Sequence, residues 1–215
     1  MFNVQFSMLR GLSLLLFTGV ASSVNAQVLW MQQQKSFVNV GEKISVSIVW
    51  GDGFNPVPWN LKREQVNKAD FHHLSIVKDL RSGLKEGEKD QIEVSLTEAG
   101  THLITLQTNS VLSTVEAEKF NEYLNTHGLD EILFNRERDG ALTKPVQERS
   151  TYYAKFLLQA GEEKDDTYKK SADFPIEIIP EKNPLTLKTG DAMRFSIRWQ
   201  GKPLFVLPDR LGKRF

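Results

Sequence analysis

Cysteine is absent from the whole 215-residue chain. This absence excludes disulfide bridges, thiolate metal sites and cysteine nucleophiles, so a packed core has to supply the stability. An excess of charge of one sign is missing too, because 27 basic side chains balance 27 acidic ones. Proteins that bind nucleic acid carry a basic patch or stripe, and this chain shows neither, so we expect no nucleic-acid partner.

Long hydrophobic runs are scarce, and the one apolar stretch lies at the start of the chain. Arg10 precedes an apolar segment from Leu12 to Val20, and small residues then lead to Ala26. This pattern predicts a cleaved signal peptide over residues 1–26, with the cut between Ala26 and Gln27. No cysteine stands at the cut to carry a lipid, and no later segment has the length of a membrane helix. We therefore expect a periplasmic protein that is not a lipoprotein and has no membrane span in its mature form.

Turn residues divide most of the chain after Gln27 into short segments of alternating polarity. These segments run from Ile44 to Trp50, Leu74 to Val77, Ile92 to Leu96, His102 to Leu106 and Tyr152 to Leu158. Short strands separated by turns, without helices between them, are typical of an antiparallel β-sandwich. The sequence therefore predicts a mainly β fold, with an N-terminal β-sandwich domain over residues 27–172.

One segment of this domain has helical spacing instead. Ser113 and Glu116 have the spacing of a capping box, Phe120 and Leu124 share one helical face, and the pattern stops at Gly128. We predict one inserted helix that packs on the sandwich, followed by a charged, solvent-exposed loop.

A repeated phrase divides the chain into two β units. GEKISVSIVWG begins at Gly41 and GDAMRFSIRWQG at Gly190, and each has a glycine, an acid, alternating apolar residues and then Trp50 or Trp199. We predict that both tryptophans close comparable sandwich interiors. Residues 173–215 are too few to form an independent core without disulfides or a metal. This partial C-terminal unit must lean on the first domain, pair with another chain, or be a truncated product.

Histidines are the candidate metal ligands. His72 and His73 point to opposite faces of a strand, so only one of them can serve a site together with His102. We predict a site of His72, His102 and Asp70, with His73 and Asp52 as the alternatives within it. The competing interpretation is that these histidines are ordinary hydrogen-bonded residues.

Catalytic motifs are missing: the chain has no G-x-S-x-G, no Gly-rich phosphate loop and no H-E-x-x-H. We therefore expect no enzymatic activity.

Phe54 and Trp59 lie on a loop that contains two prolines, where their apolar side chains could form a surface that binds a partner. The alternative for Trp59 is packing against the edge of the sandwich.

Several phrases together resemble an exported bacterial family of unknown function that includes NikM/NikK-like accessory proteins of nickel and cobalt uptake. They are AQVLWM, VGEKISVSIVWGDGF, FNEYLNTHGLDEIL, ERSTYYAKFLLQAG, FPIEIIPEKNPLTLKTGD and IRWQGKPL. The resemblance implies a periplasmic protein with an N-terminal β-sandwich and an immunoglobulin-like or carboxypeptidase-regulatory-like β unit after it. Members typically have a histidine where this chain has Gln27, and their C-terminal domain usually continues well past GKPL.

The leading hypothesis is a non-enzymatic periplasmic binding or accessory protein that assists the uptake of nickel or cobalt. Its expected partner is an envelope or membrane transport protein. Two alternatives remain open at this point. One is a structural or protein-interaction domain whose open C-terminal strand edge recruits a partner strand. The other is a truncated product.

Overall fold

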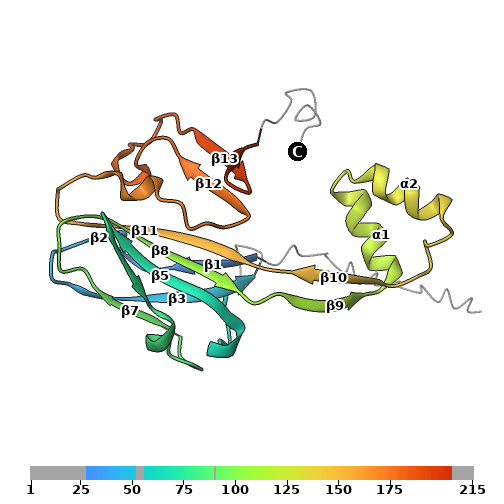
Figure 1. Cartoon of the computed structure of the whole chain (residues 1–215), viewed down its shortest axis with the longest axis horizontal. Helices are drawn as coiled ribbons and strands as arrows, with labels where there is room; N and C mark the ends of the chain where they lie inside the picture. The colour runs from blue at the N-terminus through green and yellow to red at the C-terminus, as the bar shows by residue number, and fades with distance from the viewer. Residues whose placement is uncertain (1–27, 52–55, 90, 205–215) are drawn as a thin grey trace, which may run out of the picture.

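The part of the chain that the structure describes is mainly β, with two α-helices outside its main body (Figure 1). The computed structural model describes residues 28–51, 56–89 and 91–204. The predicted signal peptide and its cut between Ala26 and Gln27 lie outside the described residues, and so do Asp52 and Phe54. The predicted β-sandwich is confirmed, since two sheets face each other across one hydrophobic core.

The first sheet is built around β3 (Lys43–Gly51). This strand pairs antiparallel with β1 (Val28–Gln32), β4 (Val57–Pro58) and β7 (Ile92–Ser95). Its side chains at alternate positions point into the core, so the predicted strand from Ile44 to Trp50 is correct.

The second sheet has the order β2, β11, β8, β5 and β6. These strands are β2 (Phe37–Val38), β11 (Tyr153–Ala160), β8 (Gly100–Thr108), β5 (Val66–His73) and β6 (Ile76–Asp79). All neighbours are antiparallel except β2 and β11, which run parallel. Short 3-10 turns occur at η1 (Arg63–Gln65), η2 (Arg81–Gly83), η3 (Asp166–Lys169) and η4 (Pro184–Thr186).

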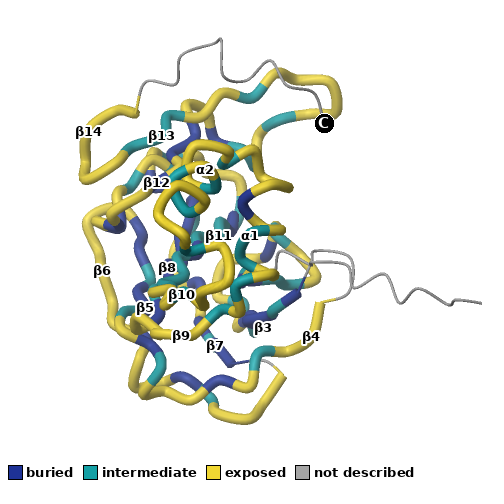
Figure 2. The backbone as a smooth tube through the Cα atoms, turned by 90° about the vertical axis from the view of Figure 1, so that its right-hand side faces the viewer, coloured by how far each residue is buried: buried dark blue, intermediate teal, exposed yellow. Residues whose placement is uncertain are grey.

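The core lies between these two sheets. Ile48 from the first sheet and Ile104 and Leu158 from the second have no exposed surface. Figure 2 shows buried backbone concentrated in this body, along strands such as β3, β5 and β8. The predicted strand from Leu74 to Val77 is wrong at its start, because Leu74 has φ of 46° in the turn between β5 and β6.

A two-stranded arm leaves the body and carries both helices at its far end (Figure 1). It consists of β9 (Val111–Val115) and β10 (Val146–Ser150), with α1 (Ala117–Thr126) and α2 (Asp130–Arg138) between them. The prediction of one helix packed on the sandwich is therefore wrong. The segment expected to be an exposed loop, NRERDGALTKP, begins inside α2, whose last four residues are Asn135 to Arg138.

Local interactions explain the difference in the arm. Ser113, expected to cap the helix, pairs with Glu148 inside the ribbon, and Glu116 takes the N-cap position of α1. Arg136 on α2 donates to the carbonyl oxygens of Ala141 and Lys144, and its guanidinium lies 5.1 Å from the ring centre of Phe120. The two helices thus stabilise each other rather than covering a sheet.

The C-terminal part forms a separate three-stranded sheet next to β8 and β11 (Figure 1). Its strands are β12 (Ile176–Pro180), β13 (Phe195–Trp199) and β14 (Lys202–Pro203). Trp199 is 50% exposed on this sheet, so the prediction that it closes an interior comparable to that of Trp50 is wrong. In the part of the chain that the structure describes, no helix is long and apolar enough to cross a membrane.

Candidate functional site

The predicted triad of His72, His102 and Asp70 does not assemble. His72 pairs with Leu103 across β5 and β8, and Asp70 pairs with Thr105, so both lie on the outer face of the second sheet. His102 lies on the inner face, because it precedes Leu103 by one residue. Among the described residues, no three His, Asp or Glu side chains are arranged as a ready-made ion site. The predicted triad is therefore wrong, because its three residues lie on opposite faces of the second sheet.

The inner face brings His73 together with His102 instead. Their rings stack with centroids 4.2 Å apart and planes inclined by 28°, and Phe71 stacks on His102 at 5.2 Å. His73 is 2% exposed and His102 is 1% exposed. Strand alternation places Phe71 and His73 on one face of β5, and β8 supplies His102 on the same face.

Both rings line a cavity of about 330 Å³ between the two sheets. Its wall also contains Lys78 from β6, Glu93 and Ser95 from β7, and Glu98 from the turn that precedes β8. The cavity therefore has imidazole, carboxylate and ammonium groups around a partly apolar floor.

Each of the two histidines makes one hydrogen bond to the backbone. Nδ1 of His73 donates to the carbonyl oxygen of Thr101 at 3.1 Å, and Nε2 of His102 donates to that of Glu98 at 3.0 Å. Carbonyl oxygens only accept, so these contacts fix which ring nitrogen carries the proton in the neutral forms. Among the described residues, Nε2 of His73 and Nδ1 of His102 have no hydrogen-bond partner although both are buried.

Burial favours a neutral His102, because it lowers the pKa of this imidazole, and the nearby His73 lowers the pKa further. The bond to the Glu98 carbonyl and the negative charges of Asp165 and Glu98 act in the opposite direction without outweighing burial. A neutral imidazole is the form that binds metal ions. The Glu98 carboxylate lies beside the pair, with Oε2 at 3.4 Å from Nε2 of His73, and its side chain is 55% exposed.

Gly100 and Asp165 hold the pair in position. Gly100 has φ of 130°, and a side-chain Cβ there would lie 2.8 Å from Cε1 of His73 and still closer to the Asp165 carboxylate. Asp165 accepts hydrogen bonds from the backbone N–H groups of Thr101 and Thr167. Burial acts to raise the pKa of Asp165, but these bonds and the nearby His73 outweigh it and lower the pKa.

His72 has a different environment on the outer face. Its Nε2 lies 3.1 Å from Oγ1 of Thr105, and burial lowers its pKa with help from nearby lysines, while Asp70 opposes the shift. Asp70 is itself 3.3 Å from the ammonium group of Lys68. These residues are satisfied by protein groups, as the competing interpretation of the histidines predicts for them.

Trp59 lines a second cavity, of about 620 Å³, at the base of the arm. Trp50 and Tyr152 line it as well, and their rings meet edge to face with centroids 4.8 Å apart. Trp59 also packs against the core, and its backbone N–H donates to the carbonyl oxygen of Ile48. The position of Trp59 thus agrees with packing at the sandwich edge, and part of its surface faces a mostly apolar hollow.

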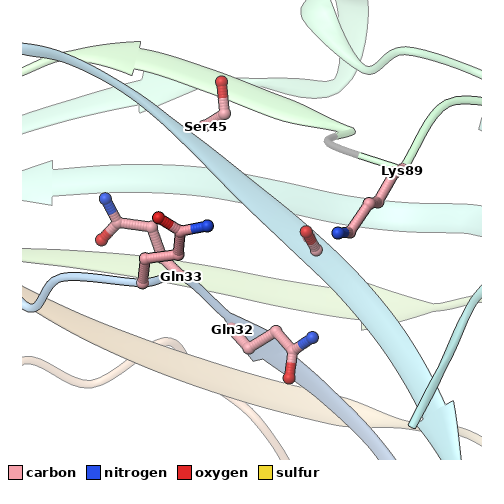
Figure 3. A pocket seen from close by; sticks show the side chains of 6 residues that line it. Gln32, Gln33, Ser45 and Lys89 are labelled. Atoms are coloured by element: carbon pink, nitrogen blue, oxygen red, sulfur yellow. The ribbon is translucent and has the colours of Figure 1, made fainter.

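A third cavity, of about 500 Å³, lies over β1 and β3 (Figure 3). Its lining is polar and consists of Gln32, Gln33, Gln34, Ser45, Ser47 and Lys89. These amides and hydroxyls offer hydrogen bonds but no imidazole, and the lysine repels cations. The lining is therefore unsuited to a transition-metal ion.

Sequence reasoning missed Glu98, Thr101 and Asp165 as parts of the histidine site. The signal for Glu98 was the EAG turn, Glu98 to Gly100, which directly precedes Thr101 and His102. Thr101 contributes through a backbone carbonyl and Asp165 through bonds to backbone N–H groups, and neither role depends on a recognisable side-chain motif.

Comparisons with known proteins give one family. A family model described as a domain of unknown function (DUF4198) matches residues 24–206. Searches of curated proteins and of solved structures gave no significant match. The family match spans the sandwich, the arm and the three-stranded sheet. The chain therefore belongs to the DUF4198 family.

Proposed function

We propose that this chain is an exported, non-enzymatic accessory protein that binds a transition-metal ion for uptake. One observation carries the proposal: two buried histidines of one cavity each keep a ring nitrogen that has no hydrogen-bond partner among the described residues. Buried polar atoms normally have a partner, so such an atom calls for an explanation. Imidazole nitrogen is a good ligand for nickel, cobalt, copper and zinc, and a bound ion would satisfy both atoms.

The groups around the cavity support binding rather than proton transfer. The pKa of His102 is lowered, mainly by burial, so its imidazole is neutral and offers a lone pair. Glu93, on the opposite wall, is engaged by Lys43 at 2.9 Å and by Lys85 at 3.0 Å. The proposal places the protein in the periplasm, where an envelope or membrane transport protein would receive the ion.

The experiment is a calorimetric titration of the mature chain, starting at Gln27, with nickel, cobalt, copper and zinc salts. We expect at least one of these ions to bind at a one-to-one ratio with a Kd well below millimolar. The control is His127→Ala, since this histidine is exposed on the arm and should not affect binding. A Kd of millimolar or weaker for all four ions would contradict the proposal.

The three-stranded sheet favours a second candidate function, a protein-interaction domain. Ile178, Phe195 and Trp199 are each at least half exposed on one face of this sheet. A sheet normally buries its apolar face against a second layer. A partner strand or layer added here would provide that cover, as in strand addition.

Light scattering coupled to size exclusion tests this second candidate. We expect self-association, or capture of envelope proteins, that Ile178→Glu abolishes. Val77→Glu is the matched control, because Val77 is equally exposed but lies on β6 of the main body. A strictly monomeric protein that captures nothing would count against the interaction role and leave the metal role unaffected.

A further inference from the structure

We infer that Nε2 of His73, Nδ1 of His102 and the carboxylate of Glu98 form one binding set for a divalent first-row transition-metal ion. This inference rests on the proposed function and deepens it by naming the ligands. It replaces the predicted set of His72, His102 and Asp70, which the β5–β8 register divides between two faces.

Each of the two histidines donates one ring N–H to a backbone carbonyl, which is the hydrogen-bond pattern typical of histidines that bind a metal ion. A ligating histidine normally donates its second ring N–H to a carbonyl or carboxylate, which fixes the tautomer and the ring orientation. His73 does this towards Thr101 through Nδ1, and His102 does it towards Glu98 through Nε2. The nitrogens that remain are the two buried ring atoms that have no hydrogen-bond partner among the described residues.

The position of Glu98 places a carboxylate beside His73. Oε2 of Glu98 lies 3.4 Å from Nε2 of His73, the ring nitrogen that makes no hydrogen bond among the described residues. A divalent ion bound between them would contact both atoms and would also satisfy Nδ1 of His102.

Glu98 is also the movable member of the set. Its backbone carbonyl is fixed by His102, whereas its side chain is 55% exposed at the cavity mouth. The imidazoles are confined by their stacking with Phe71 and by the close approach of Gly100. The stacked rings do not converge on one point, so we expect binding to require rotation of the Glu98 side chain and a tilt of the rings.

The donor types select the class of ion. Two imidazoles and one carboxylate suit cobalt, nickel, copper or zinc, whereas calcium and magnesium prefer sites made of oxygen atoms. Three protein ligands leave coordination positions for water or for groups of a receiving protein. An ion in such a site can exchange, as an accessory protein requires.

Three substitutions test the set while keeping the backbone hydrogen bonds. The side-chain amide of asparagine can reproduce the Nδ1 donor, so His73→Asn removes Nε2 together with the ring but keeps the hydrogen bond to Thr101. The side-chain amide of glutamine can reproduce the Nε2 donor, so His102→Gln removes Nδ1 together with the ring but keeps the hydrogen bond to Glu98. Glu98→Gln removes the charge at an exposed position where folding is not at risk. The matched control is His72→Gln, a buried neighbour on the outer face that also uses Nε2.

The readouts are the calorimetric Kd and the visible absorption spectrum of the cobalt(II) complex. Loss of a residue that only orients a ligand weakens binding by about 10- to 100-fold, so we expect at least about 100-fold for each histidine variant and at least about 10-fold for Glu98→Gln. The cobalt spectrum should change in each of the two histidine variants, because each variant removes one of the two nitrogen ligands. His72→Gln should match the wild type in both readouts.

Different outcomes separate this inference from the proposed function. If the wild type binds an ion and the folded variants at positions 73, 98 and 102 bind equally well, the ligands are elsewhere and only this inference fails. If Glu98→Gln alone binds as the wild type does, the carboxylate is not a ligand and the three-residue set is wrong. If the wild type binds none of the ions, the proposed function fails with it.

Discussion

β3 and β13 have closely similar sequences but occupy very different environments. Each follows a glycine of positive φ, Gly41 at 85° and Gly190 at 98°, and each carries apolar residues at alternate positions up to a tryptophan. Ile48 of β3 is completely buried between two sheets, whereas Trp199 of β13 is half exposed. A sequence pattern can therefore specify a strand and its apolar face without specifying what covers that face.

The second layer makes the difference. β3 lies opposite the five-stranded sheet, whereas β12 turns the face that carries Glu177 and Ile179 towards the body. The ammonium group of Lys155 on β11 lies 2.7 Å from a carboxylate oxygen of Glu177 on β12, and Asn183 donates to the hydroxyl of Thr101. The small sheet is attached by the face that carries Glu177 and Ile179, whereas Ile178, Phe195 and Trp199 on its other face remain at least half exposed.

The largest expected contrast is between Ile48→Ala and Ile197→Ala, which change equivalent positions of the two phrases. Ile48→Ala should lower the free energy of unfolding by about 3 to 4 kcal/mol, because it leaves a cavity in a closed core. Ile197→Ala should cost less than about 1 kcal/mol, since its surroundings are open to solvent. Urea denaturation followed by fluorescence measures both values, and equal losses would show that the second interior is closed after all.

Glu177→Gln should have the next largest effect, because it weakens the attachment of the small sheet. Glu177 is 3% exposed and binds Lys155 and the backbone N–H of Ala172. Hydrogen bonds to charged groups contribute about 1.5 to 3 kcal/mol, so we expect a loss of about 2 kcal/mol. Limited proteolysis should then cut β12–β14 before the sandwich. Glu181→Gln, at an exposed position on the same unit, should leave the cleavage pattern unchanged.

Acid should act on the same attachment with a smaller effect. Burial acts to raise the pKa of Glu177, but bonds from Lys155, Ser171 and Ala172 outweigh it and lower the pKa. The stabilisation is thus fully present above the unfolded value of about 4.3 and is lost as the pH falls through the lower folded value. Wild-type stability should therefore approach that of Glu177→Gln in this acidic range. A difference between the two proteins that stays constant from pH 6 to pH 3 would contradict this assignment.

Trp199→Lys should change stability least. Its ring is half exposed, so we expect a change within about 0.5 kcal/mol, as for most surface substitutions. The same substitution at Trp50, which packs against Tyr152 and the core, should be clearly destabilising. Thermal unfolding of the two variants measures the contrast, and a large loss at Trp199 would reveal a covering layer.

Local pattern predicted the strands of the sandwich because alternation in segments such as Ile44 to Trp50 reflects burial on one face. It failed where contacts distant in sequence decide the outcome. Ser113 has capping-box spacing, but pairing with Glu148 draws it into a ribbon. Alternation also showed that only one histidine of the pair could reach His102, yet the choice of His73 depends on the register between β5 and β8, which neither strand encodes alone.

The most direct test compares two neighbours in sequence, His72 and His73, by titrating nickel(II) into His72→Gln and His73→Asn. The account predicts that the first variant binds as the wild type does and that the second loses at least about 100-fold in affinity, because only His73 faces His102 and Glu98. Loss of binding in His72→Gln with full binding in His73→Asn would place the ion on the outer face and contradict the account.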